Sequence, residues 1–204
     1  MNILTIPVGE LSTNCYLVSD ANGTAVAIDP GADAAAIRRA LEEHSLQLRG
    51  ILLTHAHFDH IGAVAALANT IPVFCHTLDA PALRDGRLNL SAFFGCPVAA
   101  VADAVCIEDG DELSFGEMTF TVLHTPGHTV GSVCFQSGDV LFAGDTLFCE
   151  SIGRTDFPGG DLQAMRASLR RLASLDSHTR VYPGHGEPTT VSHECRCNPY
   201  MPTP

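Results

Sequence analysis

Residues 51–60 read Ile51-Leu52-Leu53-Thr54-His55-Ala56-His57-Phe58-Asp59-His60, an apolar run followed at once by four potential metal ligands. Zinc and similar ions bind imidazole nitrogen and carboxylate oxygen at about 2.0–2.2 Å, and catalytic sites keep one coordination position open for water. Four ligands within six residues cannot all reach one ion from a short turn, but they can divide between two. The stretch therefore predicts a buried strand that ends in a loop holding two adjacent divalent metals.

Three further candidate ligands lie later in the chain, each in a glycine-containing loop: His128, Asp145 and His185. Glycine lets the backbone approach a site closely, as such loops require. Seven ligands exceed what a closed structural zinc site needs, so the pattern favours a catalytic centre. Water between two ions about 3.5–4 Å apart loses a proton near neutral pH and becomes a nucleophile. Zinc is the first choice of metal, and histidine and carboxylate also suit iron and manganese.

The composition favours a single globular domain and disfavours nucleic-acid-binding and membrane-spanning proteins. The 204 residues are 46% hydrophobic and 17% charged, which predicts one well-buried domain over residues 1–204 and no disordered segment. A net charge of −12 disfavours binding to nucleic acid, and no apolar run is long enough to cross a membrane. Without a secretory leader pattern, we expect a cytoplasmic protein. All eleven basic residues are arginine, which excludes a catalytic Schiff-base lysine.

The eight cysteines are scattered along the chain, and a disulfide framework is not expected in the cytoplasm. Most of them are interpreted as small core residues, and Cys75, Cys106 and Cys134 lie in strand-like apolar runs. The pair Cys195 and Cys197 is interpreted as two unpaired thiols, with a soft-metal or redox role as the alternative.

Strand-like and helix-like segments alternate, which predicts an α/β protein. Residues 14–19 and 24–28 indicate a hairpin, and residues 118–123, 132–136 and 140–143 indicate three further strands. Apolar spacing predicts helices at 33–44, with Asp33 as a cap, and at 60–68 and 161–175. Two similar halves, each with strands and helices, suggest two sheets packed face to face with helices outside.

The ligand pattern resembles the metallo-β-lactamase superfamily over nearly the whole chain. The resemblance implies a four-layer αβ/βα sandwich with the metals at one edge of the sheets. Members that hydrolyse β-lactams commonly carry cysteine where this chain has Asp145. The element Gly153-Arg154-Thr155-Asp156-Phe157-Pro158 is similar to that of single-domain glyoxalase II-like hydrolases, and the chain is not expected to carry the helical domain that follows in full-length glyoxalase II.

By this resemblance, one metal is held by His55, His57 and His128, the other by Asp59, His60 and His185, and Asp145 bridges both. The implied reaction is hydrolysis of a small acyl thioester such as S-lactoylglutathione by a metal-bridging hydroxide, which Asp59 would help to orient. Arg154, Phe93 and Tyr200 are candidate substrate contacts, Arg154 being interpreted first as an ion-pair partner of Asp156. Asp29 resembles a residue that hydrogen-bonds a ligand loop.

Two other functions stay open at this point. The first is an iron-dependent persulfide dioxygenase of the same superfamily, which uses one metal held by two histidines and an aspartate and shares the element at 153–157. The segment Pro183-Gly184-His185-Gly186 resembles the hydrolases instead. The second is a metal-binding protein without catalysis, which the complete ligand set disfavours.

Overall fold

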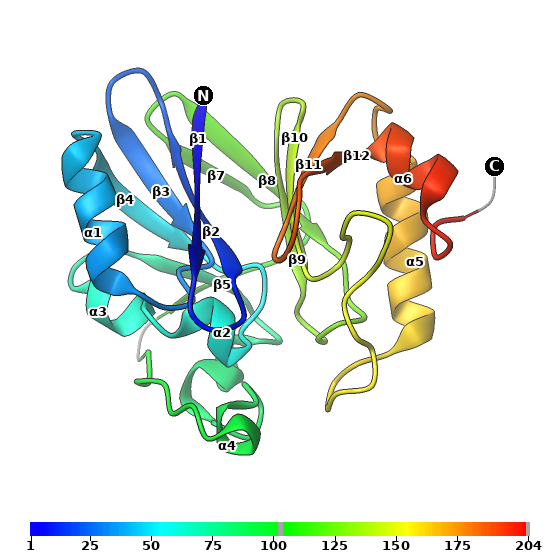
Figure 1. Ribbon diagram of the computed structural model, residues 1–204, viewed down its shortest axis with the longest axis horizontal. Coiled ribbons are helices and arrows are strands. Elements are labelled where there is room, and N and C mark those ends of the chain that lie inside the picture. The colour runs from blue at the N-terminus through cyan, green and yellow to red at the C-terminus, as the bar shows by residue number, and fades with distance from the viewer. Residues whose placement is uncertain (102–103, 203–204) are drawn as a thin grey trace.

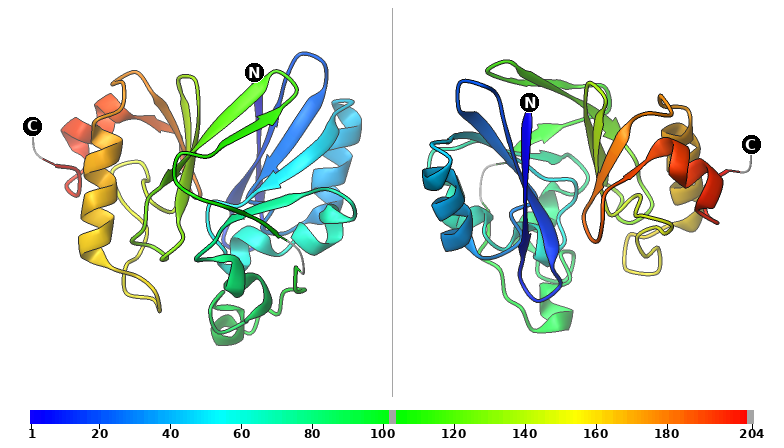
Figure 2. Two further views of the ribbon diagram at one scale, coloured as in Figure 1. Left: turned by 180° about the vertical axis from the view of Figure 1, so that it is seen from behind. Right: turned by 45° about the horizontal axis from the view of Figure 1, so that its top comes forward.

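The computed structural model describes residues 1–101 and 104–202 and contains two six-stranded sheets packed face to face. Helices cover the outer face of each sheet, so the molecule has four layers in the order helix, sheet, sheet, helix (Figure 1). The two sheets remain distinct when the molecule is seen from behind or tilted, with α1 and α5 on opposite outer sides (Figure 2). The predicted α/β sandwich is confirmed.

The first sheet is formed by the N-terminal half of the chain. Its strands, adjacent in chain order, are β1 (Asn2–Val8), β2 (Thr13–Ser19), β3 (Thr24–Ile28), β4 (Gln47–Leu52), β5 (Val73–His76) and β6 (Ala104–Ile107). The pairs β1–β2 and β2–β3 are antiparallel, which confirms the predicted hairpin, and β3 to β6 are parallel. The carboxyl ends of these four strands therefore lie at one edge of the sheet.

The second sheet is formed by the C-terminal half. Its strands are β7 (Glu112–Phe115), β8 (Met118–His124), β9 (Val133–Ser137), β10 (Val140–Gly144), β11 (Arg180–Pro183) and β12 (Thr189–Thr190). Strand β9 is antiparallel to both β8 and β10, and β10 is parallel to β11. Strands β8, β10 and β11 consequently run in the same direction and end at the same edge.

The helices are short, apart from one on each outer face. They are α1 (Ala34–Glu43), α2 (Phe58–Ile61), α3 (Val64–Ala68), the 3₁₀ helix η1 (Ala80–Arg84), α4 (Ser91–Phe94), α5 (Leu162–Ala173) and α6 (Val191–Cys197). None of the helices in the described residues has the length and apolar character that a bilayer span requires.

The core has three parts, and strand alternation explains how one strand serves two of them. In β2, Cys15 and Leu17 face the helices of the N-terminal half, whereas Tyr16 and Val18 face the second sheet. The ring of Tyr16 lies 5.3 Å from that of Phe142, centroid to centroid, and so joins the two sheets. A third cluster lies between the second sheet and α5.

The long C-terminal helix agrees with its prediction. Asp161 caps α5 by accepting hydrogen bonds from the backbone N–H groups of Gln163 and Ala164. Met165 and Leu169 are buried against the sheet. Truncating Leu169 to alanine is expected to cost about 2–5 kcal/mol of unfolding free energy.

Three local predictions were wrong. Asp33 precedes α1 but adopts a left-handed conformation, and its carboxylate accepts from the backbone N–H of Gly9 and does not cap the helix. The helix predicted at 60–68 is broken into α2 and α3 because the N–H of Ala63 donates to the carbonyl of Pro30. Cys106 is exposed because β6 is the edge strand, and only three of the eight cysteines are buried: Cys15, Cys75 and Cys134.

Candidate metal centre

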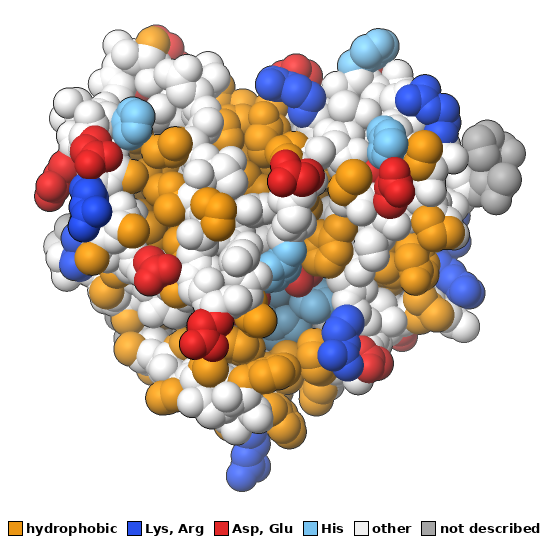
Figure 3. Space-filling model, viewed as in Figure 1, with side chains coloured by type: hydrophobic (Ala, Val, Ile, Leu, Met, Phe, Trp, Pro, Cys, Tyr) orange, Lys and Arg blue, Asp and Glu red, His pale blue; other side chains and the backbone are white. Residues whose placement is uncertain are grey.

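The seven predicted ligands meet at the edge where the parallel strands of both sheets end. The loop after β4 supplies His55, His57, Asp59 and His60, while His128 follows β8, Asp145 follows β10 and His185 follows β11. Figure 3 shows histidine side chains gathered in a hollow between the two halves of this face. His55 and His185 lie 130 positions apart in the sequence, and they meet because the strands that precede them end at the same edge of the packed sheets.

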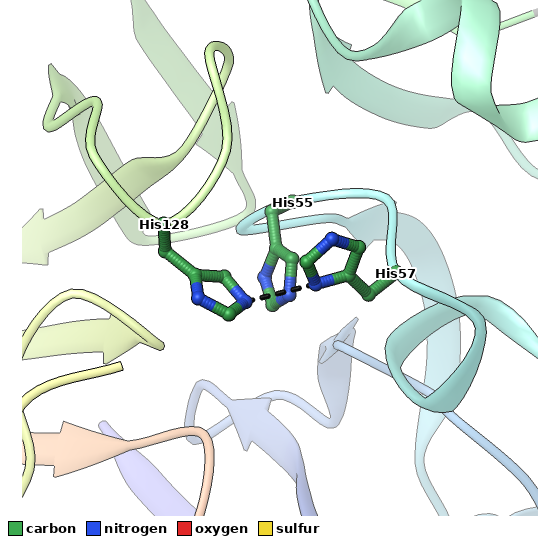
Figure 4. Close-up of side chains that lie close together, drawn as sticks. All are labelled: His55, His57 and His128. Carbon is green, nitrogen blue, oxygen red and sulfur yellow. Dashed lines mark hydrogen bonds between the residues drawn. The ribbon is translucent and has the colours of Figure 1, made fainter. Parts of the chain in front are cut away.

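Three overlapping groups of these side chains could each hold an ion, because their ligand atoms lie within 4.8 Å of one another. The groups are His55, His57 and His128; Asp59, His60 and His185; and His55, His60 and Asp145. In the first group the three imidazole rings point toward a common position, and Nδ1 of His57 lies 2.8 Å from Nε2 of His128 (Figure 4). The third group shares a residue with each of the other two and so links them.

Buried polar atoms without a hydrogen-bond partner indicate which kind of ligand the cluster can bind. Within the described residues, the buried side-chain atoms without a hydrogen-bond partner are Nε2 of His55, His57 and His60 and Oδ1 of Asp145. Leaving such atoms unpaired is costly, and buried polar groups in folded proteins nearly always have a partner. All four belong to the predicted ligand set, so the residues fit divalent metal ions.

Burial and neighbouring charges set the protonation of the ligands without metal. Burial, with the nearby rings of His128 and His60, lowers the pKa of His57 to about 3. Burial also acts to lower the pKa of His60, but the carboxylates of Asp59, Asp145 and Asp29 outweigh it and raise that pKa to about 10. Burial opposes ionisation of Asp59, yet His60 and His185 hold its pKa well below the usual range. The carboxylate is thus ionised, and a metal that binds His60 displaces a proton.

Asp29 orients two of the histidines from behind, in agreement with its predicted contact to the ligand loop. Its carboxylate accepts from the N–H of Thr54 at 2.8 Å and from the hydroxyl of Thr54 at 2.6 Å, and it lies 3.0 Å from Nδ1 of His60. The hydroxyl of Thr54 lies 3.1 Å from Nδ1 of His55. A proton on Nδ1 of His60 leaves Nε2 free to face the centre, the arrangement that tunes metal-bound histidines.

Asp79 has a similar role that the sequence analysis did not find. Its carboxylate accepts from the N–H of Ala56 at 3.1 Å, from the hydroxyl of Thr129 at 2.8 Å and from the N–H of Gly131 at 2.9 Å. The loop after β4 is thereby tied to the loop that carries His128. Asp79 lies shortly after β5, and Asp29 lies directly after β3. An aspartate that follows an apolar strand was therefore the sequence feature that could have identified Asp79.

The ligands of the C-terminal half are oriented mainly by backbone. Nδ1 of His128 lies 2.7 Å from the carbonyl oxygen of Arg154, and Nδ1 of His185 lies 3.2 Å from that of Leu11. A Cβ atom on Gly184 would lie 2.2 Å from Oδ1 of Asp145, and one on Gly153 would lie 2.0 Å from the Asp145 carbonyl oxygen. Both glycines are required for the close packing around Asp145.

A cleft of about 390 Å³ opens onto the cluster. Its walls are largely apolar, and they include Leu11, Leu90, Phe94, Phe148, Ile152 and Phe157. An adjoining hollow of about 540 Å³ shares Leu11, Phe58, Asp59 and Phe94 with it.

Of the three predicted substrate contacts, Arg154 lines the cleft and the other two do not. Arg154 lines the cleft, its guanidinium lies 4.1 Å from the ring centroid of Phe157, and it pairs with Asp156 at 2.8 Å. Phe93 and Tyr200 are exposed, and neither lines the cleft. Phe94, the neighbour of Phe93, does line it.

Comparison with known proteins agrees with this geometry. The model of the metallo-beta-lactamase superfamily matches residues 8–185. The chain belongs to this superfamily. With its fold and the clustered histidines and aspartates, it is a metal-dependent hydrolase of that superfamily.

Several known proteins are similar to this chain over most of their length. Hydroxyacylglutathione hydrolase GloC of Haemophilus influenzae is 36% identical, with 98% of each protein covered. The BLEG-1 B3 metallo-beta-lactamase crystal structure is 42% identical with a TM-score of 0.93, covering 98% of this chain and 99% of that one. TTHA1623 in a di-iron-bound form is 42% identical with a TM-score of 0.89, covering 97% and 100%. ETHE1 from Myxococcus xanthus is 33% identical with a TM-score of 0.80, covering 98% and 84%.

Proposed function

We propose that the protein is a binuclear thioesterase of the glyoxalase II type, with S-lactoylglutathione as the leading substrate. The observation that carries the proposal is the set of four unpartnered ligand atoms on residues drawn from both sheets. Similarity to hydroxyacylglutathione hydrolase GloC supports the substrate class.

In this proposal His55, His57 and His128 hold one ion, Asp59, His60 and His185 hold the other, and Asp145 contacts both. The distances support the shared role, because Asp145 lies 3.4 Å from Nε2 of His60 and 3.5 Å from Nε2 of His128. Two divalent ions, zinc by first choice and iron or manganese as alternatives, would supply a Lewis acid for the carbonyl and an acidified water as nucleophile.

The protein's own residues would position the substrate and limit access of water. The hydroxyl of Thr13 donates to Oδ2 of Asp59 at 3.1 Å and fixes that carboxylate beside the cleft. The apolar walls of Leu11, Phe94 and Phe148 suit a small acyl group, and the adjoining hollow has room for an organic thiol. The guanidinium of Arg154 is the cation in the lining of the cleft that could meet a carboxylate of glutathione.

The second candidate function is an iron-dependent persulfide dioxygenase, which similarity to ETHE1 keeps open. Two similar solved structures widen the choice of metals and substrates to assay. TTHA1623 was solved in a di-iron-bound form, and BLEG-1 is a B3 metallo-beta-lactamase. A β-lactam therefore belongs in the substrate panel.

The test combines metal content per chain with three assays on one preparation. We expect thiol release from S-lactoylglutathione, and no comparable rate with a chromogenic cephalosporin or with glutathione persulfide and oxygen. One iron per chain with oxygen uptake would replace the proposal by the dioxygenase. Full metal content with no turnover of any of the three would favour a metal-binding protein without catalysis.

A further inference from the structure

A second cluster of metal-binding side chains lies at the surface and shares no residue with the seven-ligand centre. It consists of Cys149, Glu150 and His193, whose Sγ, carboxylate and imidazole atoms lie within 4.8 Å of one another. Nε2 of His193 is 3.0 Å from Oε1 of Glu150. Two separate parts of the chain form this cluster, because His193 lies on α6 and the other two residues lie in a tight turn between Phe148 and Ser151.

The turn and the helix are held together by a buried carboxylate, so the three ligands are positioned in advance. Glu194 is fully buried, and its Oε2 accepts from the backbone N–H of Glu150 at 2.9 Å and from the side-chain amide of Asn198 at 2.8 Å. The same amide donates to the carbonyl of Ser151 at 3.0 Å. These bonds join both sides of the cluster without using the ligand atoms of Cys149, Glu150 or His193.

The donor set suits a thiophilic divalent ion. Thiolate sulfur, imidazole nitrogen and carboxylate oxygen are the three ligand types of protein zinc sites, and three protein ligands leave a fourth position for water. A hollow of about 440 Å³ is lined by Cys149 and His193 and gives room for that fourth ligand. Arg180 also lines the hollow, but its guanidinium is paired with Asp139 at 3.3 Å.

The local charge favours a cation as well. The carboxylate of Glu150 lies within 4.8 Å of both the Cys149 thiol and the His193 imidazole. A divalent cation bound there would be attracted to the carboxylate and would stabilise the thiolate that coordinates it.

We propose that Cys149, Glu150 and His193 form a separate mononuclear site for a thiophilic divalent metal, with zinc as the natural occupant. The turn continues at both ends into the wall of the cleft, through Phe148 on one side and residues 152–154 on the other. The ring of Phe148 lies 5.9 Å from that of His185. An ion at the new site therefore ties one wall of the cleft to α6, and its presence does not depend on which substrate the cleft accepts.

Cobalt distinguishes the two kinds of site because the seven-ligand centre contains no cysteine. Co²⁺ bound through sulfur gives an intense near-ultraviolet charge-transfer band, whereas Co²⁺ bound through nitrogen and oxygen gives only weak visible bands. We expect the wild-type protein titrated with Co²⁺ to show the sulfur band. Cys149→Ser should abolish it and lower the bound metal by one equivalent, and Glu150→Gln should weaken binding at this site.

Cys96→Ser is the matched control, because Cys96 is also exposed but lies away from the proposed site, in the lining of the hollow that adjoins the cleft. This variant should keep both the band and the full metal content. A band that persists in Cys149→Ser, or that is absent from the wild-type protein, would overturn the proposal.

Alkylation gives an independent measurement that needs no spectroscopy of the main centre. Zn²⁺ should protect Cys149 from iodoacetamide in peptide mapping, while Cys96 reacts equally with and without Zn²⁺. Protection should disappear in His193→Asn. Equal alkylation of Cys149 with and without Zn²⁺ in the wild-type protein would exclude a zinc thiolate there, whatever the outcome of the thioesterase assay.

Discussion

The two sheets contribute to the candidate metal centre in different ways. The N-terminal sheet supplies four candidate ligands from one loop after β4, and carboxylates from the neighbouring strand ends, Asp29 and Asp79, support that loop. The C-terminal sheet supplies one candidate ligand from the loop after each of three strands, and these are fixed by backbone carbonyls and by glycines packed against Asp145.

The two halves thus position their candidate ligand side chains by different means. A contiguous loop brings its ligands together locally but needs hydrogen bonds to fix the ring orientations. Ligands on separate strands are placed by the sheet itself, so close backbone packing can replace side-chain supports. Substitutions in the two halves should consequently reduce metal affinity for different reasons.

The largest effect is expected where the halves meet, at Asp145. Asp145→Ala removes the side chain that lies near both groups of histidines, so metal content should fall at both positions. Activity should drop by more than about 100-fold, beyond the loss usual for residues that only support a ligand. Metal analysis after dialysis and a thiol-release assay measure both quantities. Two metals retained in an active Asp145→Ala protein would contradict the shared role.

A methyl group tests the packing of the C-terminal half. In Gly184→Ala the added Cβ would lie 2.2 Å from Oδ1 of Asp145 and 2.9 Å from Cε1 of His60, so one of them must move. We expect a loss in metal affinity of about 100-fold and a decrease of about 1–3 kcal/mol in unfolding free energy. Competition with a chelator and denaturant unfolding measure the two effects.

Gly138→Ala is the control for the glycine substitution. Gly138 has a φ of +58° and no atom within 4 Å of the added Cβ, so it tests backbone strain away from the centre. It should lower stability slightly and leave metal affinity unchanged. An equal loss of affinity in both variants would mean that packing against Asp145 is not the cause.

In the N-terminal half, Asp29→Asn tests support by a carboxylate. Asparagine keeps the shape but removes the charge that faces Nδ1 of His60. Metal affinity should fall by about 10-fold, with little loss of secondary structure. Asp20→Asn is the control: Asp20 is equally buried in the same sheet but accepts hydrogen bonds at the β2–β3 turn. It should reduce thermal stability and not metal affinity.

The smallest effect is expected at Arg154, whose pair with Asp156 is exposed. Arg154→Met should leave the thermal midpoint within the scatter of repeats, because exposed ion pairs contribute little to stability. The KM for S-lactoylglutathione should rise about 10-fold, while the KM for a lactoyl thioester of an uncharged thiol stays the same. Arg171→Met, at a second exposed ion pair, should change neither KM. An unchanged KM in Arg154→Met would limit Arg154 to holding its loop.

The contrast between the halves also explains what the sequence could reveal. Four ligands in six residues are visible without a structure, and so are the hairpin at β2 and β3 and the apolar face of α5. His128, Asp145 and His185 were assigned by their glycine loops and the family resemblance, because nothing local shows that three distant loops meet.

The missed features depend on neighbours in space. In the sequence, Asp79 does not differ from any other loop aspartate. Its role depends on the pairing of β5 with β4, which places it beside the ligand loop. Strand β1 contains Pro7, which is tolerated there because β1 is an edge strand. Asp33 has the residue type of a helix cap, yet the N–H of Gly9 competes for its carboxylate. Such outcomes are decided by tertiary contacts that residue preference does not encode.

The position of His185 just after β11 also determines when the centre can form during synthesis. The ribosome delivers the loop at 55–60 first, but β11 joins β10 only after α5 has been made and has crossed back over the sheet. We therefore expect the ions to enter a chain that is already folded and not to guide its folding. The refolding rate of the denatured protein should then be the same with and without Zn²⁺, and faster refolding with Zn²⁺ would show that metal binds before the sheets are complete.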